Sequence, residues 1–351
     1  MLTTIGIIAN PASGKDIRRL VSHATVIDNN EKINIVERII LGAQAFGVER
    51  VYMMPDSYNI GYRVEDSLNT CNELKCDINV INMLNCDSIE DTICATKFME
   101  QNKVGCIVTL GGDGTNRAVA KAVENTPLIT ISTGTNNVYP VMMEGTIAGM
   151  AAAVVASHKF DERLFTIKDK RIEIYEDEAL KDIALIDAVI SKDVYVGSKA
   201  IWNIENIEKI FVTRSHPASI GFSSVVGCRK IILPKDDFGA FININSKGSQ
   251  IVAPVAAGVL NLIFTEEPVI LKLNDEFRYI SSGRGTIALD GEREIEFSKN
   301  QNFIFKITRK GPQHVDAVKA LEVAQNKGFF LAGNSSICSI VREGKIEGTY
   351  N

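Results

Sequence analysis

The stretch from Val104 to Val123, VGCIVTLGGDGTNRAVAKAV, decides the fold of the first part of this chain. The apolar, β-branched run Val104–Leu110 predicts a buried strand, and Asn116–Val123 predicts a helix. Between them, the three glycines of Gly111–Thr115 let the main chain approach a bulky anion closely and adopt torsions closed to other residues, so that several N–H groups converge on it. The helix N-terminus adds to this attraction. The stretch therefore predicts a strand, a turn and a helix that together bind phosphate.

Asp113 stands inside this phosphate-binding turn. A carboxylate there repels a bound phosphate unless it holds a metal ion or takes a proton from a nucleophile. The plainer interpretation is that Asp113 is only a turn or cap residue, and the three glycines together with two companion loops argue against it. We therefore expect phosphoryl transfer rather than simple anion binding.

Composition excludes several classes of protein. The chain has 351 residues, enough for about two domains with a core in each. A net charge of -5 and a pI near 5.6 argue against an electrostatic grip on nucleic acid. The seven cysteines form no C-x-x-C pair, which indicates neither a disulfide framework nor a zinc site and fits a reducing cytoplasm. Because no apolar run approaches about 18 residues, we expect neither secretion nor membrane spanning.

The chain changes in texture near residue 159. Before it, apolar strand candidates alternate with helical stretches, the order that produces a parallel sheet with helical crossovers. After it come short β-prone runs separated by charged or glycine turns, and then a helical pattern at 314–325. We expect a Rossmann-like α/β phosphate-binding domain at 1–158, a mainly β, sandwich-like substrate domain at 159–310, and a C-terminal segment at 311–351 that packs back on the first domain. The expected strands are 4–8, 50–54, 78–82, 105–110, 128–132, 171–175, 183–190, 240–243, 269–273 and 285–288, and the expected helices in the first domain are 34–46, 88–101, 116–123 and 146–157.

Two further loops follow strand candidates of the first domain. Parallel sheets gather ligand-binding loops beyond the carboxyl ends of their strands, so we expect both loops beside the glycine turn. The spacing matches neither G-x-x-x-x-G-K-[ST] nor G-x-G-x-x-G, which leaves a Walker-type or dinucleotide fingerprint unsupported. Taken alone, the first loop is equally compatible with an ordinary proline turn. The expected binding residues are Asn10, Ser13, Gly14 and Lys15 in the first loop, and Thr133, Gly134, Thr135, Asn136 and Asn137 in the second.

Two segments, GGDGTNR at 111–117 and GTNNVYP at 134–140, carry a family resemblance. The chain resembles the NAD kinase and diacylglycerol kinase superfamily over its whole length, and within it the ATP-NAD kinase-like AcoX type associated with acetoin catabolism. The resemblance implies an N-terminal α/β domain, a C-terminal β-sandwich domain and a site in the cleft between them. It also implies that Asp113 activates the acceptor hydroxyl, and that nucleotide phosphates bind at Gly111, Gly112, Gly114, Thr115 and Asn116.

Three elements leave the acceptor open. Asn10–Gly14 is similar to the N-P-x-S-G element of the lipid-kinase branch, which helps to bind ATP, and Asp290-Gly291-Glu292 resembles the D-G-E element of that branch. Residues 184–189 are similar to the NAD-kinase stretch whose Asn-Glu pair contacts NAD, but Ile186 replaces the amide and Asp187 shortens the acid. Asp187, Asp290 and Glu292 are therefore candidate contacts, while Asp187 as a solvated strand-edge acid and Glu292 as a turn acid are equally compatible with the sequence.

The predicted function is that of an ATP-dependent kinase. The turn holds ATP with Mg2+, and Asp113 orients the acceptor hydroxyl and accepts its proton. On the NAD-kinase interpretation the acceptor is the adenosine-ribose 2′-hydroxyl of NAD. The alternatives are a lipid, sphingoid or other small-alcohol kinase, polyphosphate as donor, and a nucleotide-binding regulator without turnover. A homo-oligomer is implied only by the resemblance. The four histidines, Tyr195 and Trp202 have no role in this hypothesis.

Overall fold

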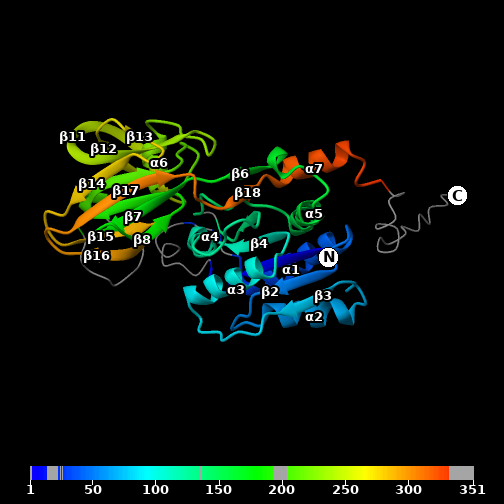
Figure 1. The fold of residues 1–351 in the computed structure, drawn as a ribbon. Helices are drawn as coiled ribbons and strands as arrows, with labels where there is room; N and C mark the ends of the chain where they lie inside the picture. Colours follow the sequence, from blue (N-terminus) through cyan, green and yellow to red (C-terminus); the bar gives the residue numbers. More distant parts are fainter. Residues whose placement is uncertain are drawn as a thin grey trace.

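The computed structural model describes residues 2–13, 23, 25, 27–134, 136–192 and 204–331. The first part is built on a sheet with the strand order β3-β2-β1-β4-β5-β18-β6, in which β1 to β5 and β18 run parallel and β6 is antiparallel (Figure 1). The central strands β1 and β4 are almost wholly buried, because helices cover both of their faces. The strands are β1 Thr4–Ala9, β2 Arg50–Met53, β3 Asp77–Val80, β4 Cys106–Gly111, β5 Leu128–Ser132, β6 Thr166–Lys168 and β18 Gln313–Val315.

Alternate residues of the central strands pack against different helices. Ile5 and Ile7 join the core of α1, α2 and α5, whereas Ile8 joins the core of α3 and α4. Within residues 1–158, helix α2 is the one described element that the sequence analysis did not predict, and strands β6 and β18 of the same sheet were not predicted either. The helix expected at 116–123 instead begins at Asp113, inside the glycine turn. The helices are α1 Asn29–Gln44, α2 Ile60–Thr70, α3 Ile89–Gln101, α4 Asp113–Ala120 and α5 Gly145–Ala156.

The second part is a sandwich of two antiparallel sheets. Its larger sheet has the order β12-β11-β10-β9-β15-β16 with β13 beside β11, and its smaller sheet has the order β14-β17-β7-β8. One core of aliphatic and phenylalanine side chains fills the space between them. The elements are β7 Arg171–Glu176, β8 Ala179–Ala184, β9 Asp187–Ser191, β10 Ile207–Val212, α6 Phe222–Gly227, β11 Phe238–Ala256, β12 Val259–Thr265, β13 Val269–Lys272, β14 Glu276–Ile280, β15 Gly285–Leu289, β16 Glu292–Phe297 and β17 Asn302–Thr308.

The chain crosses between the two parts twice, at neighbouring positions. Strand β6 leads out of the first sheet, and β18 returns beside it, paired with both β6 and β5 (Figure 1). Helix α7, Ala317–Asn326, then packs on α5. The expected helix at 314–325 thus begins as a strand. We propose 1–158, 159–310 and 311–351 as the structural units on this basis, with β6 as the segment of the middle unit that lies in the first sheet.

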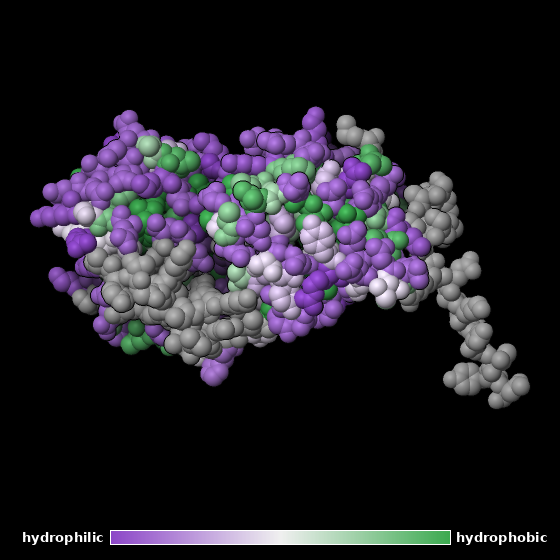
Figure 2. Space-filling model, turned by 90° about the horizontal axis from the view of Figure 1, so that it is seen from below, coloured by the Kyte–Doolittle hydropathy of each residue, from purple (hydrophilic) through white to green (hydrophobic). Residues whose placement is uncertain are grey.

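Among the described residues, no helix has the length and apolar composition needed to cross a membrane. The face seen in Figure 2 is mostly hydrophilic, and its apolar residues lie in patches between polar side chains.

Candidate functional site

The glycine turn places strand β4 directly against helix α4. The strand ends at Gly111, Gly112 is the N-cap with φ of -98°, and Asp113 is the first helical residue. The sequence-based reason for these glycines was partly wrong, because none of the three has a positive φ. Space explains two of them. A Cβ on Gly111 would lie 2.6 Å from Thr115 Oγ1, and a Cβ on Gly112 would lie 2.9 Å from Asn137 Oδ1.

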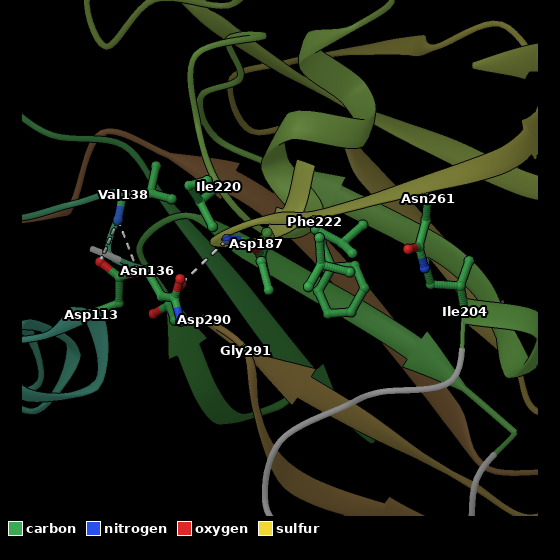
Figure 3. A pocket seen from close by; sticks show the side chains of 14 residues that line it. Asp113, Asn136, Val138, Asp187, Ile204, Ile220, Phe222, Asn261, Asp290 and Gly291 are labelled. Atoms are coloured by element: carbon green, nitrogen blue, oxygen red, sulfur yellow. Dashed lines mark hydrogen bonds between the residues drawn. The ribbon is translucent and has the colours of Figure 1, made fainter. Parts of the chain in front are cut away.

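The Asp113 carboxylate joins this turn to the loop that follows β5. Its Oδ1 accepts the N–H of Tyr139 at 2.8 Å, and both carboxylate oxygens accept the N–H of Val138 at 3.1 Å (Figure 3). Two main-chain donors therefore fix the direction of this side chain. The carboxylate is held at the wall of a cavity rather than free to rotate.

The loop after β1 lies beside the same turn. Asn10 Nδ2 donates to Thr115 Oγ1 at 3.0 Å, and Thr133 Oγ1 donates to Ser13 Oγ at 3.1 Å. The three loops that were predicted to share a site are therefore in direct contact. Gly14, Lys15 and Thr135, which the sequence also assigned to this site, lie outside the described residues.

A buried lysine that the sequence analysis missed supports the first loop. Lys32 of α1 is 1% exposed, and its ammonium donates to the carbonyl oxygens of Asn10 at 2.9 Å and Ser13 at 2.8 Å. These bonds satisfy loop carbonyls that would otherwise be desolvated. Nothing in the sequence pointed to this role, because a lysine in the first turns of a helix is usually exposed and its partners here are main-chain carbonyls of another loop.

Other predicted binding residues have structural partners. Asn116 is fully buried, accepts from Thr109 Oγ1 at 2.7 Å and donates to the Gly112 carbonyl at 2.9 Å. Asn137 Nδ2 donates to Ser132 Oγ at 2.8 Å. Asn136 reaches the second part of the molecule, where its Oδ1 accepts the N–H of Ala257 at 3.1 Å. These contacts hold the loops in place around the cavity.

The turn Asp290-Gly291 brings a second carboxylate to the site from the β sandwich. It is a two-residue hairpin between β15 and β16, with φ of 52° and 83°. The Asp290 carboxylate accepts the N–H groups of residues 185 to 187 at 2.8 to 3.2 Å. Burial raises the pKa of Asp290 above its ordinary value, against the opposing effects of Arg117 and these amides. The strand expected over 183–190 is split into β8 and β9 because the N–H groups of Leu185 and Ile186 turn toward Asp290.

Arg117 joins the two turns, and the sequence analysis quoted it without assigning it a role. Its guanidinium is fully buried on α4 and lies 2.6 Å from Glu294 Oε1. Three more carboxylates lie within ion-pair distance, those of Asp182 at 3.5 Å, Glu292 at 3.7 Å and Asp290 at 3.8 Å. Burial acts to lower the pKa of Arg117, but the negative charges around it prevail and raise the pKa. The positive charge of Arg117, on the first part of the molecule, therefore offsets the negative charges of four carboxylates on the β sandwich.

A cavity of about 160 Å³ lies between these elements. Figure 3 shows Asp113, Asp290 and Asp187 toward one end, and Phe222, Ile204 and Asn261 toward the other. Ile186, by contrast, is buried in the core, so the residue that replaces the family's amide does not line the cavity. Sequence reasoning missed the apolar lining residues because they come from segments far apart in the chain. The lining residues to which the sequence analysis assigned no role are Val138, Ile204, Ile220, Gly221, Phe222, Val255, Ala256, Val259 and Asn261.

A buried cluster behind the Asp113 loop ties it to the crossover strands. Arg214 lies over the Tyr139 ring at 5.1 Å and pairs with Asp169 at 2.6 Å, and His314 of β18 lies 3.3 Å from the same carboxyl group. Burial acts to raise the pKa of Asp169, but Arg214 and His314 outweigh it and lower the pKa to about 2. In the part of the chain that the structure describes, no three His, Cys, Asp or Glu side chains are grouped to bind a metal ion together.

Comparison with known proteins defines the class first. Residues 5–160 match the family model of the ATP-NAD kinase N-terminal domain, and residues 170–310 match that of the acetoin catabolism protein X C-terminal domain. The fold is similar to that of yeast NADH kinase, solved as a complex with NADH, with a TM-score of 0.51 and 14% identity over 95% of this chain and 89% of that one. At this identity the likeness concerns the fold alone.

A curated relative then identifies the family. The chain is 32% identical to acetoin catabolism protein X of Cupriavidus necator over 332 residues, which cover 91% of this chain and 90% of that protein. The chain therefore belongs to the acetoin catabolism protein X family, with an NAD kinase-like fold. This confirms the resemblance carried by residues 111–117 and 134–140.

Proposed function

We propose that this protein is an ATP-dependent kinase of a hydroxyl acceptor, with the adenosine-ribose 2′-hydroxyl of NAD as the first candidate. One observation carries the proposal. Asp113 of the glycine turn stands at the wall of a cavity closed on its other side by the β sandwich, with its carboxylate fixed by two loop amides. A fixed acceptor of this kind orients a hydroxyl and receives its proton as the phosphoryl group arrives.

The donor side of the site is the N-terminus of α4. First-turn amides of a helix have no partner within the helix and attract phosphate oxygens. A Cβ on Gly114 would lie 3.2 Å from Glu292 Oε1, so a larger residue at this position would crowd the turn on the side of the Glu292 carboxylate. Asn10, Ser13, Thr115, Thr133 and Gly134 border the same turn and are the proposed nucleotide contacts. Mg2+, held mainly by phosphate oxygens and water, would neutralise charge on the transferred group.

The acceptor side consists of Asp187 and Asp290 together with an apolar wall. Asp187 is 5% exposed and lines the cavity, in a position to accept hydrogen bonds from ribose hydroxyls. The Asp290 carboxylate already accepts three main-chain N–H groups, one of them from Asp187. We therefore propose that Asp290 holds Asp187 in position and that Asp187 makes the main contact with the acceptor. Glu292 is at the donor side, beside Gly114.

The apolar wall favours a second candidate acceptor. Ile204, Phe222 and Val259 line the cavity and suit the hydrocarbon part of a small alcohol or lipid better than a pyrophosphate. The reaction is the same, with ATP as donor and Asp113 as the residue that receives the hydroxyl proton.

The test is incubation of purified protein with ATP and Mg2+ and a panel of NAD, NADH, diacylglycerol, sphingoid base and short polyols, followed by mass spectrometry of the products. We expect one phosphorylated product and a loss of 10²- to 10⁴-fold in kcat for Asp113→Asn, the usual contribution of a general base. Asp66→Asn, on the exposed side of α2, is the matched control and should leave kcat unchanged. Calorimetric binding of ATP or NAD without any product would instead identify a nucleotide-binding regulator.

A further inference from the structure

The hairpin of β11 and β12 is unusual in composition. The 17 residues from Ser249 to Thr265 include no Asp, Glu, Lys, Arg or His, although 23% of the chain is charged and about four charged residues would be expected in such a length. Strands at the edge of a sheet normally carry charges that prevent association with other strands. Among the described strands, β12 is the end of the larger sheet. This edge therefore lacks the usual protection.

The two faces of the hairpin differ sharply. Ala253 and Ile263 are buried against α6, whereas the alternate side chains point to solvent. Leu260 is 68% exposed, Leu262 58% and Val252 56%, and Phe264 is also exposed. Because Val252 is opposite Leu262 in the strand register, the exposed residues form one continuous apolar stripe.

The same residues present free main-chain groups at the edge. The carbonyl of Pro254 accepts the N–H of Gly221, and that of Val252 accepts the Cys228 thiol, so both carbonyls point away from β12. The opposite residues, Leu260 and Leu262, are therefore in the non-hydrogen-bonded positions of the ladder. Their own N–H and C=O groups point outward, and so do those of Phe264, two residues further along.

We propose that this edge binds a second copy of the chain, by antiparallel pairing of β12 with the β12 of that copy about a twofold axis at Leu262. In this register Leu262 is opposite Leu262, and Leu260 is opposite Phe264. Three hydrogen-bonded pairs form, each exchanging two main-chain bonds, and the apolar stripes join across the axis. A strand without charge meets its own copy with no electrostatic repulsion.

A lipid surface fits this edge less well than a strand does. Hydrocarbon leaves outward N–H and C=O groups without partners, at a high cost in free energy, whereas a second strand satisfies them. The sequence flanks of the hairpin carry Lys247 on one side and Glu266 and Glu267 on the other, and so provide no basic field for anionic lipid. The proposal does not depend on the reaction, although the turn of the hairpin lines the cavity at Val255, Ala256 and Val259.

Sedimentation velocity over a range of protein concentrations tests the proposal. We expect a dimer for the unaltered chain and a dissociation constant raised by about 100-fold or more in Leu262→Lys, because two like charges then face each other at the axis. The matched control is Leu180→Lys, at an exposed leucine of edge strand β8 that has Glu178, Lys181 and Asp182 as neighbours, and it should not change the sedimentation of the dimer. Circular dichroism confirms that both variants are folded.

A cysteine in place of the axial leucine tests the register. The Cα atoms of a hydrogen-bonded antiparallel pair lie about 5.5 Å apart, within reach of a disulfide. Leu262→Cys should therefore give a covalent dimer on a non-reducing gel, and Leu180→Cys should not. A monomer at all concentrations, or a dimer that survives Leu262→Lys without Leu262→Cys cross-linking, overturns the proposal. So does co-sedimentation of a monomeric chain with vesicles of neutral phosphatidylcholine.

Discussion

The two Asp-Gly turns at the cavity use the same dipeptide for different physical reasons. At Asp113-Gly114 the backbone is helical, and the neighbouring glycines are needed because side chains of Thr115 and Asn137 occupy the space of a Cβ. At Asp290-Gly291 both residues have a positive φ, which a two-residue hairpin requires. The first turn depends on space and the second on conformation.

The carboxylates of the two turns also do different work. Asp113 accepts two amides from a loop of its own sheet, whereas Asp290 accepts three amides from the start of β9 and fixes the path of that strand. Arg117 lies between the two turns and faces four carboxylates. The Asp113 turn is proposed to orient a reacting group, and the Asp290 turn shapes the fold. The comparison shows that these two different roles depend on one buried cation, Arg117. The four predictions below test this division.

The largest effect is expected for Arg117→Met, which removes the cation shared by the two turns. Asp290, Glu292 and Glu294 then lose the buried cation that pairs with them, and the loss in free energy of unfolding should be about 3–5 kcal/mol. Urea denaturation measures it. Lys121→Met is the control, since Lys121 pairs with the same Asp182 at 2.8 Å but is partly exposed, and its loss should be below about 1 kcal/mol. Equal losses would mean that the burial of Arg117 is unimportant.

Low pH should weaken the support of the loop that binds Asp113. This loop packs on the buried cluster of Asp169, Arg214 and His314 through the ring of Tyr139. The pKa of Asp169 is lowered to about 2, so its contribution to stability is complete above its ordinary pKa near 4 and is lost as the pH falls toward 2. The free energy difference between the unaltered chain and Asp169→Asn should therefore shrink by about 2 kcal/mol over that range. Thermal melts at a series of pH values measure it, and a difference that stays constant over that range would contradict the assigned pairing of Asp169 with Arg214 and His314.

Gly291→Ala tests the turn that depends on conformation. With φ at 83°, a Cβ is strained whatever the space around it, and the cost should be about 1–2 kcal/mol. Differential scanning calorimetry should show a lower Tm. Gly291→Asn should recover part of the loss, because asparagine tolerates the left-handed region. An unchanged Tm in Gly291→Ala would contradict the assigned torsion.

Gly114→Ala tests the turn that depends on space and should have the smallest effect on stability, within about 0.5 kcal/mol. Its Cβ would lie 3.2 Å from Glu292 Oε1, at the proposed approach to phosphate. ATP affinity measured by calorimetry should fall at least tenfold, whereas in Gly291→Ala it should fall less than threefold. The reverse order of the two affinities would place the phosphates away from the first turn.

Periodicity and glycine punctuation were enough to predict the order of elements in the first part. The expected strands at 4–8 and 128–132 are observed as Thr4–Ala9 and Leu128–Ser132, because continuous apolar runs fit only the buried centre of a parallel sheet. Helix α2 was missed because its apolar residues are few and interrupted by polar ones. The split at 185–187 could not be read from a local pattern, since its cause is a carboxylate about a hundred residues away.

The candidate site was predicted in part. The contacts between Asn10 and Thr115 and between Ser13 and Thr133 follow from the rule that loops gather at one edge of a parallel sheet. The roles of Lys32, Arg117 and Asn261 could not be predicted from the sequence, because the contacts of each side chain depend on which distant segment packs against it.

The sequence by itself determined the parallel sheet, the glycine turn with its embedded acid and the family resemblance, because these are local patterns of side-chain size and polarity. Only the tertiary structure decided that Arg117 pairs with four carboxylates, that Asp290 fixes the start of β9 and that the uncharged strand β12 lies at the edge of its sheet. Those features depend on distances between segments far apart in the chain, and electrostatic and main-chain interactions are set by distance, not by position in sequence.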